Sequence, residues 1–584
     1  MTDLQRSVLA IISALVVLLA TLILRSSGNQ AESVRVTEAE LLFESSSACD
    51  TARSLATRFP ERAMGTDDGK AAATWIESEM KRFGLRTARQ QFSAWIAGER
   101  VEGQNIIGTD EGIRDGVIVM VAHYDIPFHV REGAMDDASG VGVLLELARV
   151  FSREEQNKTL VFIASDGEEW GMLGARHFVK EYPGLEQIRA VVSFDCVGLE
   201  RSENIFLYRE GQFCGHTPLW LWMLAEDCIS RVGGKTPSPS LLMQYASQAV
   251  NISGTDQGPF LRAGVPGINF GSSPSKSPLA RKVYHTRSDT SENLKPELFE
   301  MYGRATELLT RSVDALDHST DNNPYYLRTG KRMYVGRFGL LTLQVFLFLP
   351  LFLATVFQYY NLRVRERFIR KALVEVANIS LFALPWLFAL GVLYLLVWTN
   401  FVPKYELYPA TLLDPFLSNP DWSAIAIVAS AFVAAWIGIC FLRRSLSLWG
   451  KPDFASSKAV CLDVLFTLSL IALILNGFTA SFFLAPAALL WGWIEQDPRV
   501  GHRLLNGAFA LAGALPIVFF TIVLSQKVML GPYVFWYLFL GVGYWFFSPL
   551  AVLIAVGTAT VGGRLLQTSF AKIRVTTEPG AENE

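Results

Sequence analysis

Acidic and imidazole side chains follow short apolar runs in the first half of the chain. Three such runs end in these side chains: GVIVMVAHYD in His123 and Asp125, KTLVFIASDGEE in Glu168 and Glu169, and AVVSFD in Asp195. Two further candidates, Asp136 and His285, lie in the segments GAMDDASG and VYHTRSDT. Taken singly, each has an ordinary structural interpretation, such as an exposed acidic pair or a helix cap. Together, nitrogen and oxygen donors without thiolates are the ligand set that suits zinc paired with a second ion.

The apolar runs that precede these side chains have the length and composition of buried strands. Residues 116–125, 158–169, 190–195 and 264–271 are rich in Val, Ile and Phe, as is typical of strands buried on both faces. Helical patterns alternate with them, which predicts an α/β fold with a largely parallel, mixed sheet flanked by helices. Because such sheets bind ligands beyond the carboxyl ends of their strands, we expect the candidate side chains to meet at one edge.

Composition divides the 584 residues into a half suited to water and a half suited to lipid. Only 18% of the residues are charged, against about 25% in a typical soluble domain. Residues 31–332 have the composition of a soluble protein, whereas residues 334–566 are a succession of apolar runs rich in Phe, Leu and Trp. The net charge of −3 gives no electrostatic reason to expect a nucleic-acid partner. The chain is therefore predicted to join a soluble domain to an all-α, multi-span membrane domain.

The apolar runs predict an N-terminal anchor and several later spans. The expected spans are residues 8–24, 335–359, 379–398, 422–442, 460–475, 481–494, 504–524 and 532–561. Pro549 interrupts the last run, which is either one long, bent helix or two short ones. No clean A-x-A site follows the first run, which favours an uncleaved anchor. The transporter alternative is disfavoured because Glu375 and Asp463 lie near predicted helix ends, where an interfacial position is expected.

Positive charge in short loops predicts which ends of the spans are cytoplasmic. Five basic residues lie in 363–371, namely Arg363, Arg365, Arg367, Arg370 and Lys371, and a second group follows residue 442: Arg443, Arg444 and Lys451. Between them, residues 400–421 carry Glu406, Asp414 and Asp421, as an exterior loop does. The first half of the chain is then non-cytoplasmic. Arg564, Lys572 and Arg574 favour a cytoplasmic C-terminus, hence eight spans rather than nine.

The motifs resemble, in sequence and in order, those of the M28 family of zinc peptidases, the aminopeptidase and glutamate-carboxypeptidase group. The matching motifs are AHYD, GAMDDASG, SDGEEWGMLG, SFDCVG, GTDQGPFLRAGVPGINFG and YHTRSD, and they cover roughly residues 48–314. Upstream, RFPERAMGTDDGK resembles the family's R-x-x-G-T/S turn. The membrane half is similar, in architecture only, to multi-span members such as the endoplasmic-reticulum metallopeptidases.

The resemblance implies a role for each candidate residue, and two zinc ions per chain. His123 and Asp195 would bind one zinc, Glu169 and His285 the other, and Asp136 would bridge both. Glu168 would be the general base, Asp125 would orient His123, and Tyr284 would donate to the developing oxyanion. One departure is Thr255-Asp256-Gln257, where many simple aminopeptidases have Ser-Asp-His. All five ligands are present, which favours a peptidase over the single-zinc glutaminyl cyclases of the same fold.

Several expectations about organisation and function follow. We expect an anchor in 1–30, an M28-like domain in 31–316, a linker in 317–333, a membrane domain in 334–566 and a cytoplasmic tail in 567–584. The expected function is hydrolysis of peptides at their N-terminus, in a periplasm or organelle lumen, with a bacterial inner membrane favoured because the C-terminus lacks a retrieval signal. A catalytically inactive, receptor-like or chaperone-like member of the fold is the alternative. The pair Cys214 and Cys228 forms either a disulfide or two free thiols.

Overall fold

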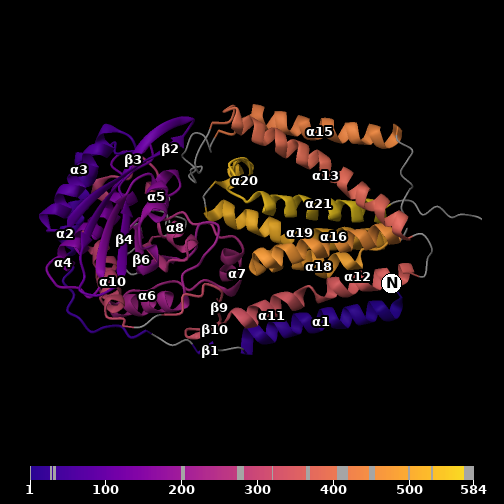
Figure 1. Ribbon diagram of the computed structural model, residues 1–584, viewed down its shortest axis with the longest axis horizontal. Helices are drawn as coiled ribbons and strands as arrows, with labels where there is room; N and C mark the ends of the chain where they lie inside the picture. The colour runs from indigo at the N-terminus through magenta and orange to yellow at the C-terminus, as the bar shows by residue number, and fades with distance from the viewer. Residues whose placement is uncertain are drawn as a thin grey trace, which may run out of the picture.

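The computed structural model divides into an α/β part and a bundle of apolar helices, which lie end to end (Figure 1). It describes residues 2–26, 29–30, 34–198, 204–272, 282–317, 320–363, 368–403, 419–445, 454–496, 500–527 and 530–570. We call residues 34–317 the α/β part, and helix α1 together with residues 337–570 the helical part. A three-stranded antiparallel sheet lies at the junction: β1 (Asn29–Gln30), β10 (Met333–Val335) and β9 (Leu327–Arg328).

The α/β part is built on a seven-stranded mixed sheet with the order β2-β3-β5-β4-β6-β8-β7. Its strands are β2 (Arg86–Ile96), β3 (Glu99–Asp110), β4 (Val117–His123), β5 (Thr159–Ser165), β6 (Ile188–Asp195), β7 (Phe206–Tyr208) and β8 (Gly267–Gly271). The strands β5, β4, β6 and β8 are parallel, whereas β2, β3 and β7 are antiparallel strands at the edges. The four predicted runs are these four parallel strands, so the predicted fold class is confirmed.

Strand β4 shows why these runs fold as central strands. All seven of its residues are buried, because successive side chains point to opposite, helix-covered faces of the sheet. Ile118, Met120 and Ala122 belong to the core under α2 (Ser45–Arg58), α3 (Asp67–Arg82), α4 (Ser139–Phe151), α6 (Leu219–Arg231) and α10 (Pro296–Asp314). Val117, Val119 and Val121 belong to the core under α5 (Leu173–Glu181) and α8 (Gln257–Arg262). Figure 1 shows α5 and α8 on the face nearer to the helical part.

Within the described residues, seven helical segments are long and apolar enough to cross a membrane. They have a mean hydropathy of 1.6 to 2.5 and comprise Asp3–Leu22, Arg337–Asn361, Lys371–Trp398, Trp422–Leu442, Phe454–Leu475, Gly501–Gln526 and Pro549–Ser569. They belong to α1 (Asp3–Ser26), α11 (Arg337–Leu347) with α12 (Leu349–Arg363), α13 (Phe368–Trp398), α15 (Trp422–Ser445), α16 (Phe454–Leu475), α19 (Val500–Lys527) and α21 (Pro549–Ser569). The helical part is thus compatible with a multi-pass membrane protein.

The run predicted at 481–494 is a chain of short helices rather than one span-length helix. It comprises α17 (Gly477–Phe483), α18 (Ala485–Leu490) and a 3-10 turn, η5 (Trp491–Trp493). Pro486 has no backbone N–H for a continuous helix, and the break lies just before it. The segment nevertheless runs the length of the bundle. The Asn476 amide nitrogen is 3.1 Å from the Gln248 carbonyl of the α/β part, whereas Glu495 pairs with Arg6 of α1 at 2.8 Å.

The run 532–561 is two helices, which decides between the two predicted alternatives. They are α20 (Val534–Gly543) and α21, separated at residues 544–548. Pro549 is the first residue of α21, and the Ser548 hydroxyl accepts a hydrogen bond from the Ala551 N–H at 3.1 Å. Proline at the first helical position and serine at the cap are typical of a helix start.

Glu375, which lies near the start of α13 as the sequence predicts, is paired within the bundle. Its side chain is fully buried between α13 and α21, where Arg564 donates to its two carboxylate oxygens at 2.6 and 2.8 Å. Arg564 therefore serves as a partner inside the bundle and not as a free flanking charge. Neither residue is tolerated alone in such an environment, because an unpaired buried charge is costly. Seven of the charged residues used to predict the topology lie outside the described residues: Arg365, Arg367, Glu406, Asp414, Lys451, Lys572 and Arg574.

Candidate metal centre

The carboxyl-terminal edge of the parallel strands brings the predicted site residues together. His123 is the last residue of β4 and Asp195 the last of β6. Glu168 and Glu169 form a 3-10 turn that begins three residues after β5 ends. Gly167, which precedes this turn, has a φ of +70° and allows the chain to reverse there without a side-chain clash. The predicted convergence of strand ends is thus the arrangement that the sheet imposes.

Asp136 lies between the two histidines at the centre of the cluster. Its Oδ1 is 3.3 Å from His123 Nε2, and its Oδ2 is 2.9 Å from His285 Nε2. His285 Nε2 is also 3.0 Å from Glu169 Oε2. Glu168 lies beside this group, with Oε2 3.9 Å from His123 Nε2. The two oxygens of the Asp136 carboxylate therefore face two different histidines, His123 and His285.

Two overlapping groups of donor atoms share Asp136. In one, atoms of His123, Asp136 and Glu169 all lie within 4.8 Å of one another, and in the other, so do atoms of Asp136, Asp195 and Cys196. Cys196 is a neighbour that the sequence did not single out. Burial and the adjacent carboxylates raise the pKa of its thiol well above the ordinary value, so the thiol stays protonated and is a poor metal ligand.

The donor atoms fit a bound cation. Four of the five predicted ligands, His123, Asp136, Glu169 and His285, are at least nine-tenths buried, yet the buried atoms Glu169 Oε1 and His285 Nδ1 make no hydrogen bond to a described residue. Buried polar atoms without hydrogen-bond partners require an explanation, and a metal ion supplies one. The mixture of imidazole nitrogen and carboxylate oxygen is a zinc-type ligand set.

The electrostatics of the cluster also favour a cation. Burial, reinforced by neighbouring carboxylates, raises the pKa of Glu168 well above its ordinary range and that of Asp195 to about 7. Burial opposes protonation of His285, but Glu169 and Asp136 outweigh it and raise the pKa of the imidazole to about 10. These directions describe an excess of buried negative charge. A divalent cation would offset that charge and keep the carboxylates ionised and the imidazoles neutral.

Asp125 connects the strand that carries His123 to the glutamate turn. Its Oδ1 accepts a hydrogen bond from the Glu168 N–H at 3.0 Å, and its Oδ2 one from the Glu169 N–H at 3.4 Å. Oδ1 is also 3.5 Å from His123 Nδ1, on the ring side opposite the cluster. Tyr284 stacks on His285 with ring centroids 3.9 Å apart. Burial raises the pKa of Tyr284 well above its ordinary value, so the phenol remains a hydrogen-bond donor.

Two residues that the sequence did not assign a role hold the loop around Asp136. Asp289 accepts hydrogen bonds from the N–H groups of Met135 and Asp136 at 2.8 and 3.1 Å. The fully buried Arg62 donates to the carbonyls of Tyr124 and Gly133 at 2.6 and 2.7 Å. Both lie within the recognised motifs YHTRSD and RFPERAMG. Their spacing in sequence gave no indication that they would meet this loop.

The departure Thr255-Asp256-Gln257 does not supply a ligand to these groups. Asp256 accepts a hydrogen bond from the Ser165 hydroxyl, and Gln257 accepts one from the Ser193 hydroxyl at 3.2 Å. His129 lies close to the cluster, with Nε2 3.3 Å from the His285 carbonyl, but it belongs to neither group of donor atoms. His285 is also outside both groups, although its Nε2 lies within 3.0 Å of Asp136 and Glu169. Cys214 is exposed and Cys228 buried, and both are free thiols.

A pair of aromatic rings lies beside the glutamate turn. Trp170 directly follows Glu169 and is buried, whereas Phe128, on the loop between Asp125 and Asp136, is 55% exposed. The two ring centroids are 5.2 Å apart. An exposed aromatic ring next to a buried polar cluster gives the rim of the site an apolar wall.

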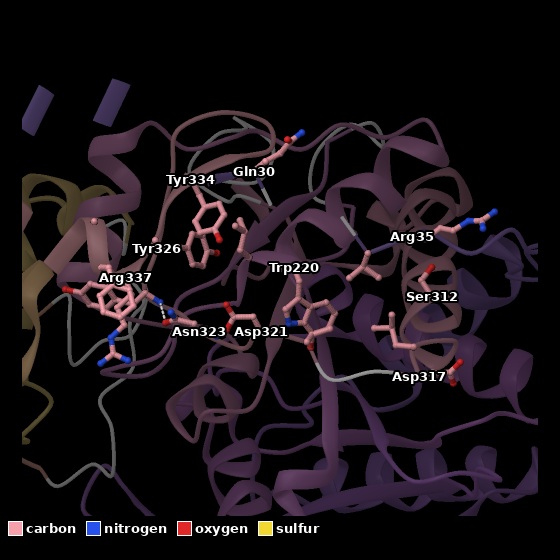
Figure 2. Close-up of a pocket in the computed structure, with 18 of the residues that line it drawn as sticks. Gln30, Arg35, Trp220, Ser312, Asp317, Asp321, Asn323, Tyr326, Tyr334 and Arg337 are labelled. Carbon is pink, nitrogen blue, oxygen red and sulfur yellow. Dashed lines mark hydrogen bonds between the residues drawn. The ribbon is translucent and has the colours of Figure 1, made fainter. Parts of the chain in front are cut away.

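A separate cavity of about 1390 Å³ lies at the junction of the two parts, and Figure 2 shows Trp220, Tyr326, Tyr334 and Arg337 around it. None of the predicted site residues lines this cavity. It is therefore distinct from the metal centre.

Residues 105–310 match peptidase family M28. The chain therefore carries an M28 peptidase domain, as the motifs predicted, and the matched residues include the five predicted ligands together with Asp125, Glu168 and Tyr284. The family assignment implies zinc as the metal of the site, since relatives of the chain are named zinc metalloproteases.

Among the relatives, aminopeptidase YwaD of Bacillus subtilis is 32% identical over 253 residues, which is 42% of this chain and 49% of that protein. A probable zinc metalloprotease of Pyrenophora tritici-repentis is 29% identical over 257 residues, 36% of this chain and 57% of the relative. The chain thus spans about half the length of the curated relatives it matches. Among solved structures, a zinc aminopeptidase from Bacillus subtilis is similar over 48% of this chain and 99% of its own, with 18% identity and a TM-score of 0.39.

Proposed function

We propose that the protein is a membrane-bound, zinc-dependent aminopeptidase that hydrolyses peptides outside the cytoplasm. The observation that carries this proposal is the position of Asp136, whose two carboxylate oxygens face His123 and His285 separately. A bridging carboxylate is the feature expected of a site for two metal ions. The second ligand of each ion would be Asp195 on the His123 side and Glu169 on the His285 side, giving two zinc ions per chain.

The positions of the residues around this centre support peptide hydrolysis. Zinc held by these residues would supply a metal-bound water with a pKa lowered towards ~7. Glu168, beside His123, would accept the proton of that water and later deliver it to the leaving amine. Tyr284, protonated and stacked on His285, would donate to the carbonyl oxygen as it gains charge. Asp125 would hold the orientation of His123 through its ring Nδ1.

The proposal is tested by digestion of a peptide library with the purified full-length protein, with and without a chelator. We expect stepwise loss of N-terminal residues that the chelator abolishes. Cleavage confined to internal bonds would contradict the assignment as an aminopeptidase, although not as a peptidase. No cleavage of any peptide by zinc-loaded protein would favour the inactive, receptor-like alternative. Loss of a metal ligand would be the usual sign of such a protein, and all five predicted ligands are present.

The proposed topology places the α/β part, within the predicted domain 31–316, on the outer side of the membrane and residues 363–371 on the inner side. The ends of the bundle support this arrangement. Asn361, near the end of α12, donates to Gln5 of α1 at 2.9 Å, and the α/β part contacts the opposite ends of the helices (Figure 1). The compartment would be a periplasm, with a bacterial inner membrane favoured, or an organelle lumen.

Cysteine labelling in intact cells tests this topology. The exposed native thiols Cys214 and Cys440 are first changed to serine. A cysteine introduced as Arg367→Cys is expected to react only after the membrane is permeabilised, whereas one introduced as Glu99→Cys, in the hairpin of the α/β part, reacts from outside. Labelling of the first variant from outside would reverse the proposed orientation.

The aromatic rim predicts a preference for apolar substrate residues. We expect Phe128→Ala to lower kcat/KM for substrates with a large apolar side chain by roughly five-fold, because the side chain loses part of the ring that would shield it from water. Substrates with N-terminal Gly or Ala should be affected much less. Ile113→Ala is a matched control, since Ile113 is 61% exposed and lies before the opposite end of β4. An equal loss for large and small residues would contradict this role of Phe128.

A further inference from the structure

The segment between α7 (Leu241–Ala249) and α8, residues 250–256, reaches from the helical part to the metal centre. We call it the α7–α8 loop. It begins beside α17 and α20 and ends at Asp256, which is buried beside Ser165, the last residue of β5. The beginning of the loop is bound by hydrogen bonds from the helical part, its middle packs on apolar residues, and its end is hydrogen-bonded to a strand of the central sheet.

At its beginning, the loop is held by polar side chains of α17. The last carbonyl groups of a helix have no partner within the helix and need an external donor. The Thr479 hydroxyl donates to the Ala249 carbonyl at 2.6 Å, and the Asn476 amide donates to the Gln248 carbonyl at 3.1 Å. The end of α7 is thus capped by the helical part.

In its middle, the loop packs on apolar residues of the helical part. Ile252 is buried in a cluster with Val402, Leu530, Trp536, Tyr537, Leu540 and Phe546. The adjacent Asn251 carbonyl accepts a hydrogen bond from the Phe213 N–H at 2.9 Å, and the Phe213 ring packs edge-on against Phe546 with centroids 5.2 Å apart. The loop therefore cannot shift without disturbing α20 and its neighbours.

At its end, the loop contacts β5, whose last residue lies beside His123, and it leads directly into Gln257 of α8, which contacts β6, the strand that carries Asp195. The Asp256 carboxylate accepts a hydrogen bond from the Ser165 hydroxyl, and Ser165 is the register partner of His123 in the parallel pair of β4 and β5. Gln257, the next residue, accepts a hydrogen bond from Ser193, two residues before Asp195 in β6. Movement of the loop would be transmitted to the strand ends that hold both side chains.

We propose that the helical part helps to position the residues of the catalytic centre. In this arrangement, α17 and α20 hold the α7–α8 loop, and the loop in turn holds the strand ends at His123 and Asp195. Thr479 and Asn476 are positioning residues in this arrangement, because they act through the loop and touch no metal ligand. The inference rests on the proposed function only for its effect on hydrolysis. The contacts between the helical part and the α7–α8 loop do not depend on which reaction the centre catalyses.

The test uses the full-length protein with Thr479→Val, which keeps the shape of the side chain and removes the hydroxyl. Thr521→Val is the matched control, since the Thr521 hydroxyl donates only to the Ile517 carbonyl of its own helix, at 2.8 Å. Thr479→Ser keeps the donor and should behave as the unmodified protein. We expect Thr479→Val alone to lower kcat/KM by roughly five-fold, the effect of losing one hydrogen bond.

Amide hydrogen exchange of residues 250–257 gives a second readout that does not depend on activity. We expect exchange there to be several-fold faster in Thr479→Val than in Thr521→Val, and unchanged in the central strands, which would exclude general unfolding. Equal exchange and equal kcat/KM in the two valine variants would overturn the inference. If the unmodified protein hydrolyses no peptide, the proposed function fails, whereas the exchange comparison still decides whether the helical part holds the loop.

Discussion

Glu168→Gln is expected to lower kcat by a factor of ~10² or more while both metal ions stay bound. Glutamine keeps the size of the side chain but cannot accept a proton, and a general base contributes ~10²–10⁴-fold to a rate. The structure places Glu168 beside the donor groups without making it a member of either one, 3.9 Å from His123. The backbone of the turn should be preserved, because Asp125 binds the N–H of residue 168 and not its side chain.

The adjacent substitution Glu169→Gln is expected to lower zinc binding rather than proton transfer. Glu169 lies 3.0 Å from His285 and within the group formed with His123 and Asp136, so a neutral amide in its place weakens a metal site. We expect lower zinc occupancy, and partial recovery of activity in excess zinc. Excess metal cannot rescue Glu168→Gln, because proton transfer is lost rather than occupancy. Elemental analysis and kcat, measured on both variants across zinc concentrations, check the contrast.

Two outcomes would contradict this assignment. Loss of metal in Glu168→Gln together with retention in Glu169→Gln would reverse the roles of the two glutamates. Unchanged hydrolysis in both variants would show that peptides are not hydrolysed at this centre at all.

Removal of metal is expected to abolish hydrolysis, and reconstitution should restore two zinc-class ions per chain. Five ligands with one shared carboxylate leave neither ion adequately bound without Asp136. We therefore expect Asp136→Asn to lose both ions, whereas Asp195→Asn should weaken chiefly one, since Asp195 belongs to only one of the two donor groups. Both variants remove one carboxylate charge, so they are matched in chemistry.

Elemental analysis after dialysis against a chelator and then zinc provides the measurement. The unmodified protein should bind close to two ions, Asp195→Asn close to one and Asp136→Asn close to none. No bound metal in the reconstituted, unmodified protein would contradict the metal centre. Saturation at a single ion, with equal losses in the two variants, would instead contradict the bridging role of Asp136.

The sequence alone determined the central sheet and the class of the peptidase domain. Short apolar runs rich in Val, Ile and Phe predicted strands buried on both faces, and these runs form β4, β5, β6 and β8. Ligands at strand ends followed from this, since parallel strands share one carboxyl-terminal edge. The seven long apolar helical segments of the described residues were similarly predictable, because lipid-facing helices need long apolar runs.

Only the tertiary structure decided which polar residues meet across long distances in the chain. Glu375 is paired with Arg564, 189 residues away, inside the bundle. Arg62 and Asp289 hold the loop around Asp136 from segments that are distant from it in sequence. Thr479 reaches the end of α7 from the helical part. Periodicity and spacing describe the local environment of a residue, whereas these pairings depend on how complete elements pack, so no local pattern could have revealed them.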